Sequence, residues 1–329
     1  ILDGDFHLAD PADNEVLLLR VKDELTKIEK KERFYAVLEK ISFGLSLGSI
    51  LLLAVLGLAI TFGVMGVINM AHGELIMLGA YTAFVVQSFM PQQVGLALII
   101  SLPVAFMVAG GFGALIQYFV IRHLNNRPLD TLLATFGISL VMQQLARIIF
   151  SPLNRQVVSP DWLTGSLVIN PMFSLTYNRL YIFTFALLVF AFLHLIIKES
   201  SLGLQVRAVS QNREMAKALG IRTNRIDALT FALGSGVAGL AGVALSQLVN
   251  VGPNLGQAYL IDSFLVVVFG GVGNLLGTFI GSFSLGILNK LLEPELGAVL
   301  SKVVILVFLI LFIQKRPEGL FPQKARSLS

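Results

Sequence analysis

The stretch ISFGLSLGSILLLAVLGLAITFGVMGVINMAHG (Ile41–Gly73) contains no Asp, Glu, Lys or Arg. A helix needs about 20 apolar residues to cross about 30 Å of hydrocarbon, so this stretch is long enough for one crossing. Comparable charge-free runs cover 75–121, 131–146, 180–197, 228–261 and 263–289. The runs do not alternate as the strands of a transmembrane barrel would. The sequence therefore predicts an all-α polytopic membrane protein.

The composition points to the same class. The chain has 329 residues, of which 55% are hydrophobic and 13% are charged, and its mean hydropathy is +0.80. A soluble domain carries about 25% charged residues. The chain has no cysteine, which excludes disulfides and thiolate metal sites. Topology-setting loop residues account for the net charge of +4, so no nucleic-acid partner is expected.

About nine transmembrane helices follow from these runs and their flanks. We expect two related, inverted halves with broken helices. The predicted spans lie near 43–66, 74–90, 94–121, 129–150, 180–198, 227–250, 258–271, 274–290 and 297–314.

A short amphipathic helix is predicted before the first span, over residues 13–41. Its apolar residues recur at spacings of three and four, with charges between them: Leu18, Val21, Leu25 and Ile28. The stripe fits either a fragment of a helical domain or an interfacial helix on the bilayer. We favour the fragment, because the acidic residues match the basic ones and would repel anionic lipid.

The basic segments indicate which ends of the spans face the cytoplasm. Lys and Arg gather in the loop 199–226 and in the tail KRPEGLFPQKAR, and such residues are enriched in cytoplasmic loops. An even number of crossings must then separate the two segments. That favours two short helices with a hinge at GGVGN (Gly270–Asn274) over one tilted helix. Five crossings before the loop place the N-terminus outside, although Lys27, Lys30, Lys31 and Arg33 lie near it.

The loop 151–179, between the fourth and fifth spans, faces outside in this topology. It is long enough to pack over the mouth of a pathway or to meet a soluble partner. The alternative is an ordinary exposed loop with an interfacial Trp162.

The run RAVSQNREMAKALGIRTNRID (Arg207–Asp227) carries a predicted two-turn helix in the cytoplasmic loop. Asn212 can cap this helix, and Glu214 lies in its favourable first turn. Met215, Ala218 and Leu219 share one face, and Gly220 supplies the stop. The run is either a docking site for a cytoplasmic partner or a positive loop that only sets topology.

Two segments break the helical pattern at membrane depth: GVMGVINMAHGELIMLGAY (Gly63–Tyr81) and VFGGVGNLLGTFIG (Val268–Gly281). Irregular backbone in a membrane must be buried in protein or line a watery path. Interrupted segments, one in each half of a transporter, point to a substrate route. The candidate path or gate residues are Asn69, His72, Glu74, Gln143, Asn274 and Thr278. The candidate hinge glycines are Gly66, Gly73, Gly270, Gly271 and Gly273.

Each of these assignments has a structural alternative. The first break fits equally a turn at the membrane surface satisfied by water. The glycines of the second fit close helix packing. Gln143, Gln144 and Arg147 face either the bundle interior or other helices, with Arg147 reaching the outer interface.

The chain shows no energy source and no catalytic arrangement. It has no GxxxxGK[ST] loop for phosphate and no supported nucleophile–base pair, so we expect no enzyme activity. His72 and Glu74 lack the i, i+4 spacing of helical metal ligands, so no metal is predicted. Asp262 and Lys302 lie near predicted helix ends and receive no role. Energy for active transport would come from a partner or an ion gradient.

Four ordered motifs resemble the permeases of branched-chain amino-acid type ABC importers: INMAHGELIMLGAY (Ile68–Tyr81), NREMAKALGI (Asn212–Ile221), VVVFGGVGNLLGTFIG (Val266–Gly281) and RPEGLF (Arg316–Phe321). Within that family, the chain is most similar to the first permease subunit of urea ABC importers. The resemblance implies a permease domain over 43–323, after the end of an extracytoplasmic region (1–42) and before a tail (324–329). It also implies a multi-pass protein of the bacterial inner membrane.

The resemblance implies a complex with a second permease, two ATP-binding subunits and an extracytoplasmic substrate-binding protein. ATP and Mg²⁺ would then belong to the ATP-binding subunits, and this chain would hold no cofactor. The loop helix would be the ATPase-coupling helix, formed by Arg213, Glu214, Met215, Ala216, Lys217, Ala218, Leu219 and Gly220.

The resemblance implies urea or short amides as the substrate, and the scarcity of charge along the spans fits a neutral solute slightly better than a zwitterion. Branched-chain amino acids are the alternative within the same family. Two other classes stay open: a gradient-driven secondary transporter with a proton site at His72 and Glu74, and a passive urea or amide channel. Neither of these needs a docking helix.

Overall fold

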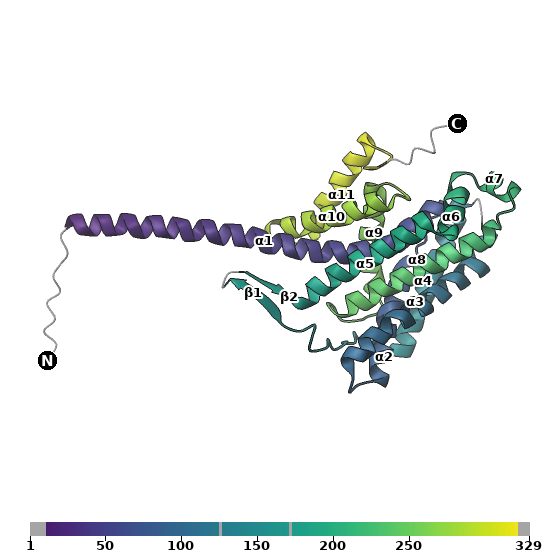
Figure 1. Ribbon diagram of the computed structural model, residues 1–329, viewed down its shortest axis with the longest axis horizontal. Coiled ribbons are helices and arrows are strands. Elements are labelled where there is room, and N and C mark those ends of the chain that lie inside the picture. Colours follow the sequence, from purple (N-terminus) through teal and green to yellow (C-terminus); the bar gives the residue numbers. More distant parts are fainter. Residues whose placement is uncertain (1–10, 125–126, 171–172, 322–329) are drawn as a thin grey trace.

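The computed structural model describes residues 11–124, 127–170 and 173–321, which form a helical bundle with one long protruding helix (Figure 1). Each of the predicted spans corresponds to a separate helix in this part of the chain. These helices are α1 (Pro11–Met65), α2 (His72–Phe89), α3 (Val94–Phe119), α4 (Pro128–Phe150), α5 (Tyr177–Glu199), α8 (Thr223–Ser246), α9 (Leu255–Gly270), α10 (Leu275–Leu296) and α11 (Ala298–Lys315). A short 3-10 turn, Ile121–His123, follows α3.

Seven of the described helices are long and apolar enough to cross a membrane, which confirms the all-α polytopic class. The two remaining predicted spans are α2 and α9. The 16 residues of α9 rise only about 24 Å, less than the hydrocarbon thickness of about 30 Å. Both helices border an interruption of the chain, so the shortness of α9 is explained by the break at its end. The relation between two inverted halves stays a prediction.

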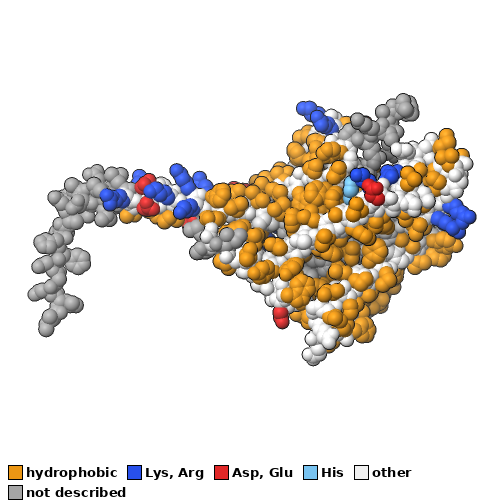
Figure 2. Space-filling view, viewed as in Figure 1, with side chains coloured by type: hydrophobic (Ala, Val, Ile, Leu, Met, Phe, Trp, Pro, Cys, Tyr) orange, Lys and Arg blue, Asp and Glu red, His pale blue; other side chains and the backbone are white. Residues whose placement is uncertain are grey.

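The first helix is longer than the sequence pattern predicted. α1 has 55 residues and joins the amphipathic segment and the first span without interruption, so no break separates them at residue 42. Gly44 and Gly48 lie within it because they pack against the backbone of α10 rather than ending the helix. The protruding half is charged and exposed, whereas apolar side chains cover the bundle (Figure 2). Whether this half belongs to a larger helical domain stays a prediction.

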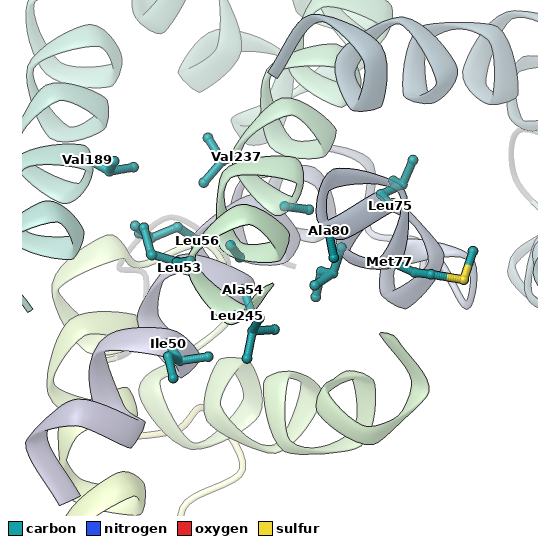
Figure 3. Close-up of a cluster of buried hydrophobic side chains, with 14 of the residues drawn as sticks. Ile50, Leu53, Ala54, Leu56, Leu75, Met77, Ala80, Val189, Val237 and Leu245 are labelled. Carbon is teal, nitrogen blue, oxygen red and sulfur yellow. The ribbon is translucent and has the colours of Figure 1, made fainter. Parts of the chain in front are cut away.

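The centre of the bundle is formed by α1, α2 and α8. Leu53 and Leu56 of α1, Leu75 of α2 and Leu245 of α8 are fully buried in one cluster (Figure 3). Lipid is as apolar as leucine, so membrane helices associate mainly through close packing of small residues. Gly79 of α2 accordingly lies directly against α8, where an added Cβ would be 2.6 Å from a backbone Cα.

The predicted outer loop contains a hairpin that the sequence did not reveal. Strands β1 (Ser166–Asn170) and β2 (Phe173–Thr176) pair antiparallel. The amide of Asn170 donates to the Tyr35 hydroxyl at 2.8 Å, which ties the hairpin to the protruding half of α1. Hydrogen bonds between Gln87 and the backbone of Val158, each 2.8 Å long, hold the loop against the end of α2. The loop therefore packs over one end of the bundle, while a role in meeting a soluble partner stays a prediction.

The opposite end of the bundle gathers the basic loop and the C-terminal segment. The loop forms α6 (Ser201–Gln211) and α7 (Arg213–Ala218). A cavity of about 150 Å³ joins α6 to the end of α1 and to the break before α10. The N–H of Leu320 donates to the carbonyl of Phe269 at 2.9 Å, so the C-terminal segment packs at the same break. This shared location supports four crossings between α7 and the tail, with α9 and α10 as separate helices.

Single cysteines will test this topology, since the chain has none of its own. Cysteines at Asn224 and Glu318, both exposed, should react only with reagent added to the cytoplasmic side. A cysteine at Asp161, exposed in the opposite loop, should react only from outside. A membrane-impermeant maleimide added to intact cells measures reaction from outside, and the same reagent added to inverted vesicles measures reaction from the cytoplasmic side. Labelling of Glu318→Cys from outside would contradict the four-crossing arrangement.

Candidate functional site

The loop helix α7 has well-formed ends. The Oδ1 atom of Asn212 accepts a hydrogen bond from the N–H of Met215 at 2.9 Å, which satisfies one free donor of the first turn. At the other end, Gly220 has a φ of 84°, a conformation that side chains disfavour. The N–H of Gly220 donates to the carbonyl of Lys217, and that of Ile221 to Ala216, which closes the helix as a Schellman motif. The predicted cap and stop are confirmed.

One face of α7 is anchored and the other is free. Ala216, at 2% exposure, packs with Val206 of α6 and Ile226 of α8. Met215 and Leu219 are 58% and 75% exposed, although both are large and apolar. We call the exposed residues Glu214, Met215, Ala218 and Leu219 the docking face. Ala216, which we had grouped with them, instead holds the helix in place.

Arg213 also belongs to the anchored side. Its guanidinium nitrogens donate to both carboxylate oxygens of Asp227, whose side chain is completely buried in α8. The exposed fraction of the Arg213 side chain is 26%. Asp227 was not among the predicted site residues. One signal in the sequence pointed to this residue: an acidic residue at the start of a predicted span, directly after a loop rich in Lys and Arg.

The first interruption runs from Gly66, with a φ of 67°, to the start of α2. The Oδ1 atom of Asn69 accepts from the N–H of Ala71 at 3.0 Å. The Nε2 atom of His72 lies 2.8 Å from the carbonyl of Ala54 on α1. Asn69 and His72 are both buried and bond within the protein rather than facing solvent. Their contacts hold the start of α2 inside the bundle.

Glu74 lies in the first turn of α2 and has no exposed surface. Its Oε1 atom accepts from the hydroxyl of Ser139 at 2.9 Å and from the amide of Gln143 at 2.8 Å. The fold therefore brings together two predicted path residues that are far apart in sequence. Ser139 was missed, although it belongs to a stripe of buried polar residues at every fourth position of α4: Thr131, Thr135, Ser139 and Gln143.

The second interruption has a different composition. Gly271 and Gly273 have φ values of 102° and 77°, which break the chain between α9 and α10. Asn274 caps α10 by accepting from the N–H of Leu276 at 3.0 Å. The hydroxyl of Thr278 donates to the carbonyl of Asn274 at 2.9 Å. Thr278 thus bonds within α10, whereas the amide of Asn274 also donates to the carbonyl of Phe321 at 3.4 Å. Neither residue shares a hydrogen bond with Glu74 or Gln143.

Two of the predicted hinge glycines are packing residues instead. Gly73 lies inside α2, where a Cβ would be 2.7 Å from the carbonyl oxygen of Gly256. Gly270 ends α9 against the backbone of Gly277 on α10. Gly66, Gly271 and Gly273 are at the breaks themselves. The glycines at the breaks have a positive φ, whereas the two packing glycines do not. The sequence pattern does not reveal this difference in backbone conformation.

Other charged side chains bond across helices in more exposed positions. The Nζ atom of Lys302 on α11 lies 3.2 Å from the Oδ2 atom of Asp262 on α9, although neither residue had been given a role. The guanidinium of Arg147 donates to the Oδ1 atom of Asn254 at 2.9 Å. Within the described residues, no group of three or more His, Asp or Glu is placed to hold a metal ion.

Comparison with known proteins agrees over nearly the whole chain. Residues 40–313 match the family described as "Branched-chain amino acid transport system / permease component". The chain is 31% identical to the high-affinity branched-chain amino acid transport system permease protein LivH of Escherichia coli K12, over 88% of this chain and 96% of LivH. It is also 31% identical to the permease protein BraD of Pseudomonas aeruginosa, over 87% of this chain and 96% of BraD.

One solved structure, PsaBC from Streptococcus pneumoniae in complex with Fab, aligns with 92% of this chain and 98% of that chain. Its TM-score of 0.44 and identity of 14% are too low to establish a shared fold. The sequence relatives are transport permeases rather than enzymes, which agrees with the expectation that the chain is not a catalyst. The chain belongs to the family of permease components of branched-chain amino acid transport systems.

Proposed function

We propose that the chain is a transmembrane permease subunit of an ATP-driven importer of branched-chain amino acids in the bacterial inner membrane. The observation that carries this proposal is the docking face of α7, displayed beside a membrane bundle that matches this family over residues 40–313. LivH and BraD, by their names, serve branched-chain amino acid transport. These relatives favour the amino-acid alternative over urea.

Charge is scarce along the spans in the sequence, which on its own favours a neutral solute such as urea. Glu74 and Asp227 are in fact fully buried. Ionisable side chains within membrane helices are commonly functional. A route that handles a zwitterion is therefore compatible with this bundle.

The partners follow from the same proposal. Two ATP-binding subunits would receive the docking face, and ATP and Mg²⁺ would be held in those subunits. An extracytoplasmic binding protein would deliver the amino acid, and a second permease would complete the pathway. A secondary transporter or a passive channel has no use for an exposed apolar helix on a cytoplasmic loop.

Coupling would pass from α7 to the central helices. Arg213 joins α7 to Asp227 of α8, and α8 packs closely against α1 and α2. Movement of α7 by an ATP-binding subunit would then displace α8 relative to Glu74 and the breaks. Nucleotide and substrate would bias one two-state element, which is the requirement for coupling between distant sites.

Introducing a charge into the docking face should uncouple the importer. In Leu219→Asp, the carboxylate would be desolvated in the apolar groove that receives Leu219. Loss of a central interface residue costs about 2 kcal/mol or more, which is roughly a 30-fold loss of affinity. We therefore expect substrate-stimulated ATP hydrolysis to fall at least about tenfold.

The matched control is Asn224→Asp, which adds the same charge at an exposed position of the same loop. Stimulated ATP hydrolysis by the reconstituted complex is the measurement, and membrane insertion of each variant is checked by its abundance in membranes. Wild-type stimulation of Leu219→Asp would rule out α7 as the docking element.

A further inference from the structure

A buried carboxylate with one unused oxygen lies between α2 and α4. Both hydrogen bonds to Glu74 reach its Oε1 atom. Within the described part of the chain, no donor is within hydrogen-bond distance of its Oε2 atom, and this atom is buried. A buried polar atom without a partner is rare in folded proteins and is unfavourable in an apolar environment. This atom can therefore accept a donor supplied from outside the chain.

The helix that contacts Glu74, α4, also carries a cationic group. The polar stripe of α4 ends at Gln143, and Arg147 follows one turn later, about 6 Å further along the helix. The Nη2 atom of Arg147 donates to the neutral side chain of Asn254, and Nη1 lies 3.3 Å from Gln144. Within the described residues, no carboxylate lies within 4.0 Å of Arg147. The hydrogen-bond partners of its guanidinium are thus neutral amides.

These two groups complement the two ends of an amino-acid zwitterion. An ammonium group offers three donors to a carboxylate oxygen, and a carboxylate accepts the paired N–H groups of a guanidinium. A neutral solute such as urea has no charge for either group to bind. Every amino acid carries these same ammonium and carboxylate groups. The two residues would therefore recognise the groups that all amino acids share and not the aliphatic side chain.

Three other polar residues around the start of α2 already have hydrogen-bond partners. His72 bonds to the carbonyl of Ala54, and Asn69 bonds to the backbone of α2. Thr135 accepts from the N–H of Met70 at 3.1 Å. They position the start of α2, whereas Glu74 keeps one buried oxygen without a partner.

We propose that Glu74 and Arg147 bind the charged ends of the amino acid during its passage, with Glu74 Oε2 accepting from the ammonium and Arg147 donating to the carboxylate. The proposal rests on the proposed function, because it names how that substrate class is recognised in the bundle. α4 contacts the bundle mainly through α2, so the substrate would bind between these two helices.

The first test is uptake of leucine by the complete reconstituted complex with its binding protein. Glu74→Gln keeps the side-chain shape and removes the charge, and Arg147→Gln removes the cation. Loss of a charged hydrogen-bond partner corresponds to about a 10- to 100-fold loss, so each variant should import leucine at least about tenfold more slowly. Co-purification of each variant with the ATP-binding subunits at the wild-type yield shows that the complex is assembled.

The controls remove the same charges elsewhere. Arg127→Gln acts at the opposite end of α4, and Asp262→Asn removes an intramembrane carboxylate while keeping a hydrogen bond to Lys302. Both should import leucine within about twofold of wild type. If Glu74→Gln and Arg147→Gln also do so, the zwitterion site is refuted while the proposed function stands. A wild-type complex that imports no branched-chain amino acid would refute the proposed function and the site with it.

A second measurement needs no variant. Binding to the folded state raises the melting temperature by mass action. The wild-type complex without binding protein, at millimolar solute, should be stabilised by leucine but not by leucinamide, which lacks the carboxylate. It should also not be stabilised by 4-methylpentanoate, which lacks the ammonium group, or by urea. Equal stabilisation by leucine and its singly charged analogues would overturn the proposal.

Discussion

Replacing Gly79 by leucine will prevent the permease from accumulating as a folded protein. Gly79 lies where α2 crosses α8, and an added Cβ would be 2.6 Å from the Cα of Gly239. Real Cβ atoms do not approach backbone so closely, and a rigid helix cannot move one residue without displacing its neighbours. Overpacking typically costs 1–3 kcal/mol, and we expect about 3 kcal/mol or more here because backbone meets backbone.

The matched control is Gly111→Leu on α3, where an added Cβ meets no atom within 4 Å. Both glycines lie inside helices and neither has a positive φ, so the gain in helix propensity is the same in both variants. Gel-filtration profiles of detergent-extracted protein before and after heating will measure the difference. A Gly79→Leu variant as stable and as active as Gly111→Leu would show that α2 and α8 are not in close contact.

Removing Arg213 will leave the buried carboxylate of Asp227 without its partner. Breaking a buried ion pair from one side is destabilising by about 3–5 kcal/mol, because the remaining charge stays desolvated. We expect Arg213→Ala to loosen α7 from α8, so that leucine uptake falls more than basal ATP hydrolysis. Lys217→Ala breaks the exposed pair with Glu214 on the same helix. It should change stability by at most about 1 kcal/mol.

A double-mutant cycle isolates the interaction between Arg213 and Asp227 from the separate contribution of each side chain. Arg213→Ala with Asp227→Ala removes both charges, so the double variant should be more stable than Arg213→Ala alone. Melting temperature and leucine uptake are measured for the four proteins of the cycle. Additive losses would mean that the two side chains do not interact, and that α7 is held only by the packing of Ala216.

In the proposed zwitterion site, the residue that binds the ammonium group lies directly after the first interruption. Gly66 turns the chain, Asn69 and His72 secure the start of α2, and Glu74 follows in its first turn. The second interruption carries a cap and close-packed glycines rather than a free polar group. The two breaks therefore have different roles in this structure, although they look alike in the sequence.

The hydrophobic runs determined the helices, because a backbone in lipid must satisfy its own hydrogen bonds and therefore forms helices wherever the run is long enough. Local chemistry also determined the ends of α7, since Asn212 and Gly220 act on backbone atoms only a few residues away. The exposed positions of Met215 and Leu219 followed from the same short helix.

Only the tertiary structure decided which side chains meet. Glu74 contacts Ser139 and Gln143, and Arg213 contacts Asp227, through helix packing that no local pattern encodes. The same holds for Gly73, which looked like a break and is a packing contact. Sequence spacing records neighbours within one helix, whereas the register between helices depends on how small residues allow their backbones to approach.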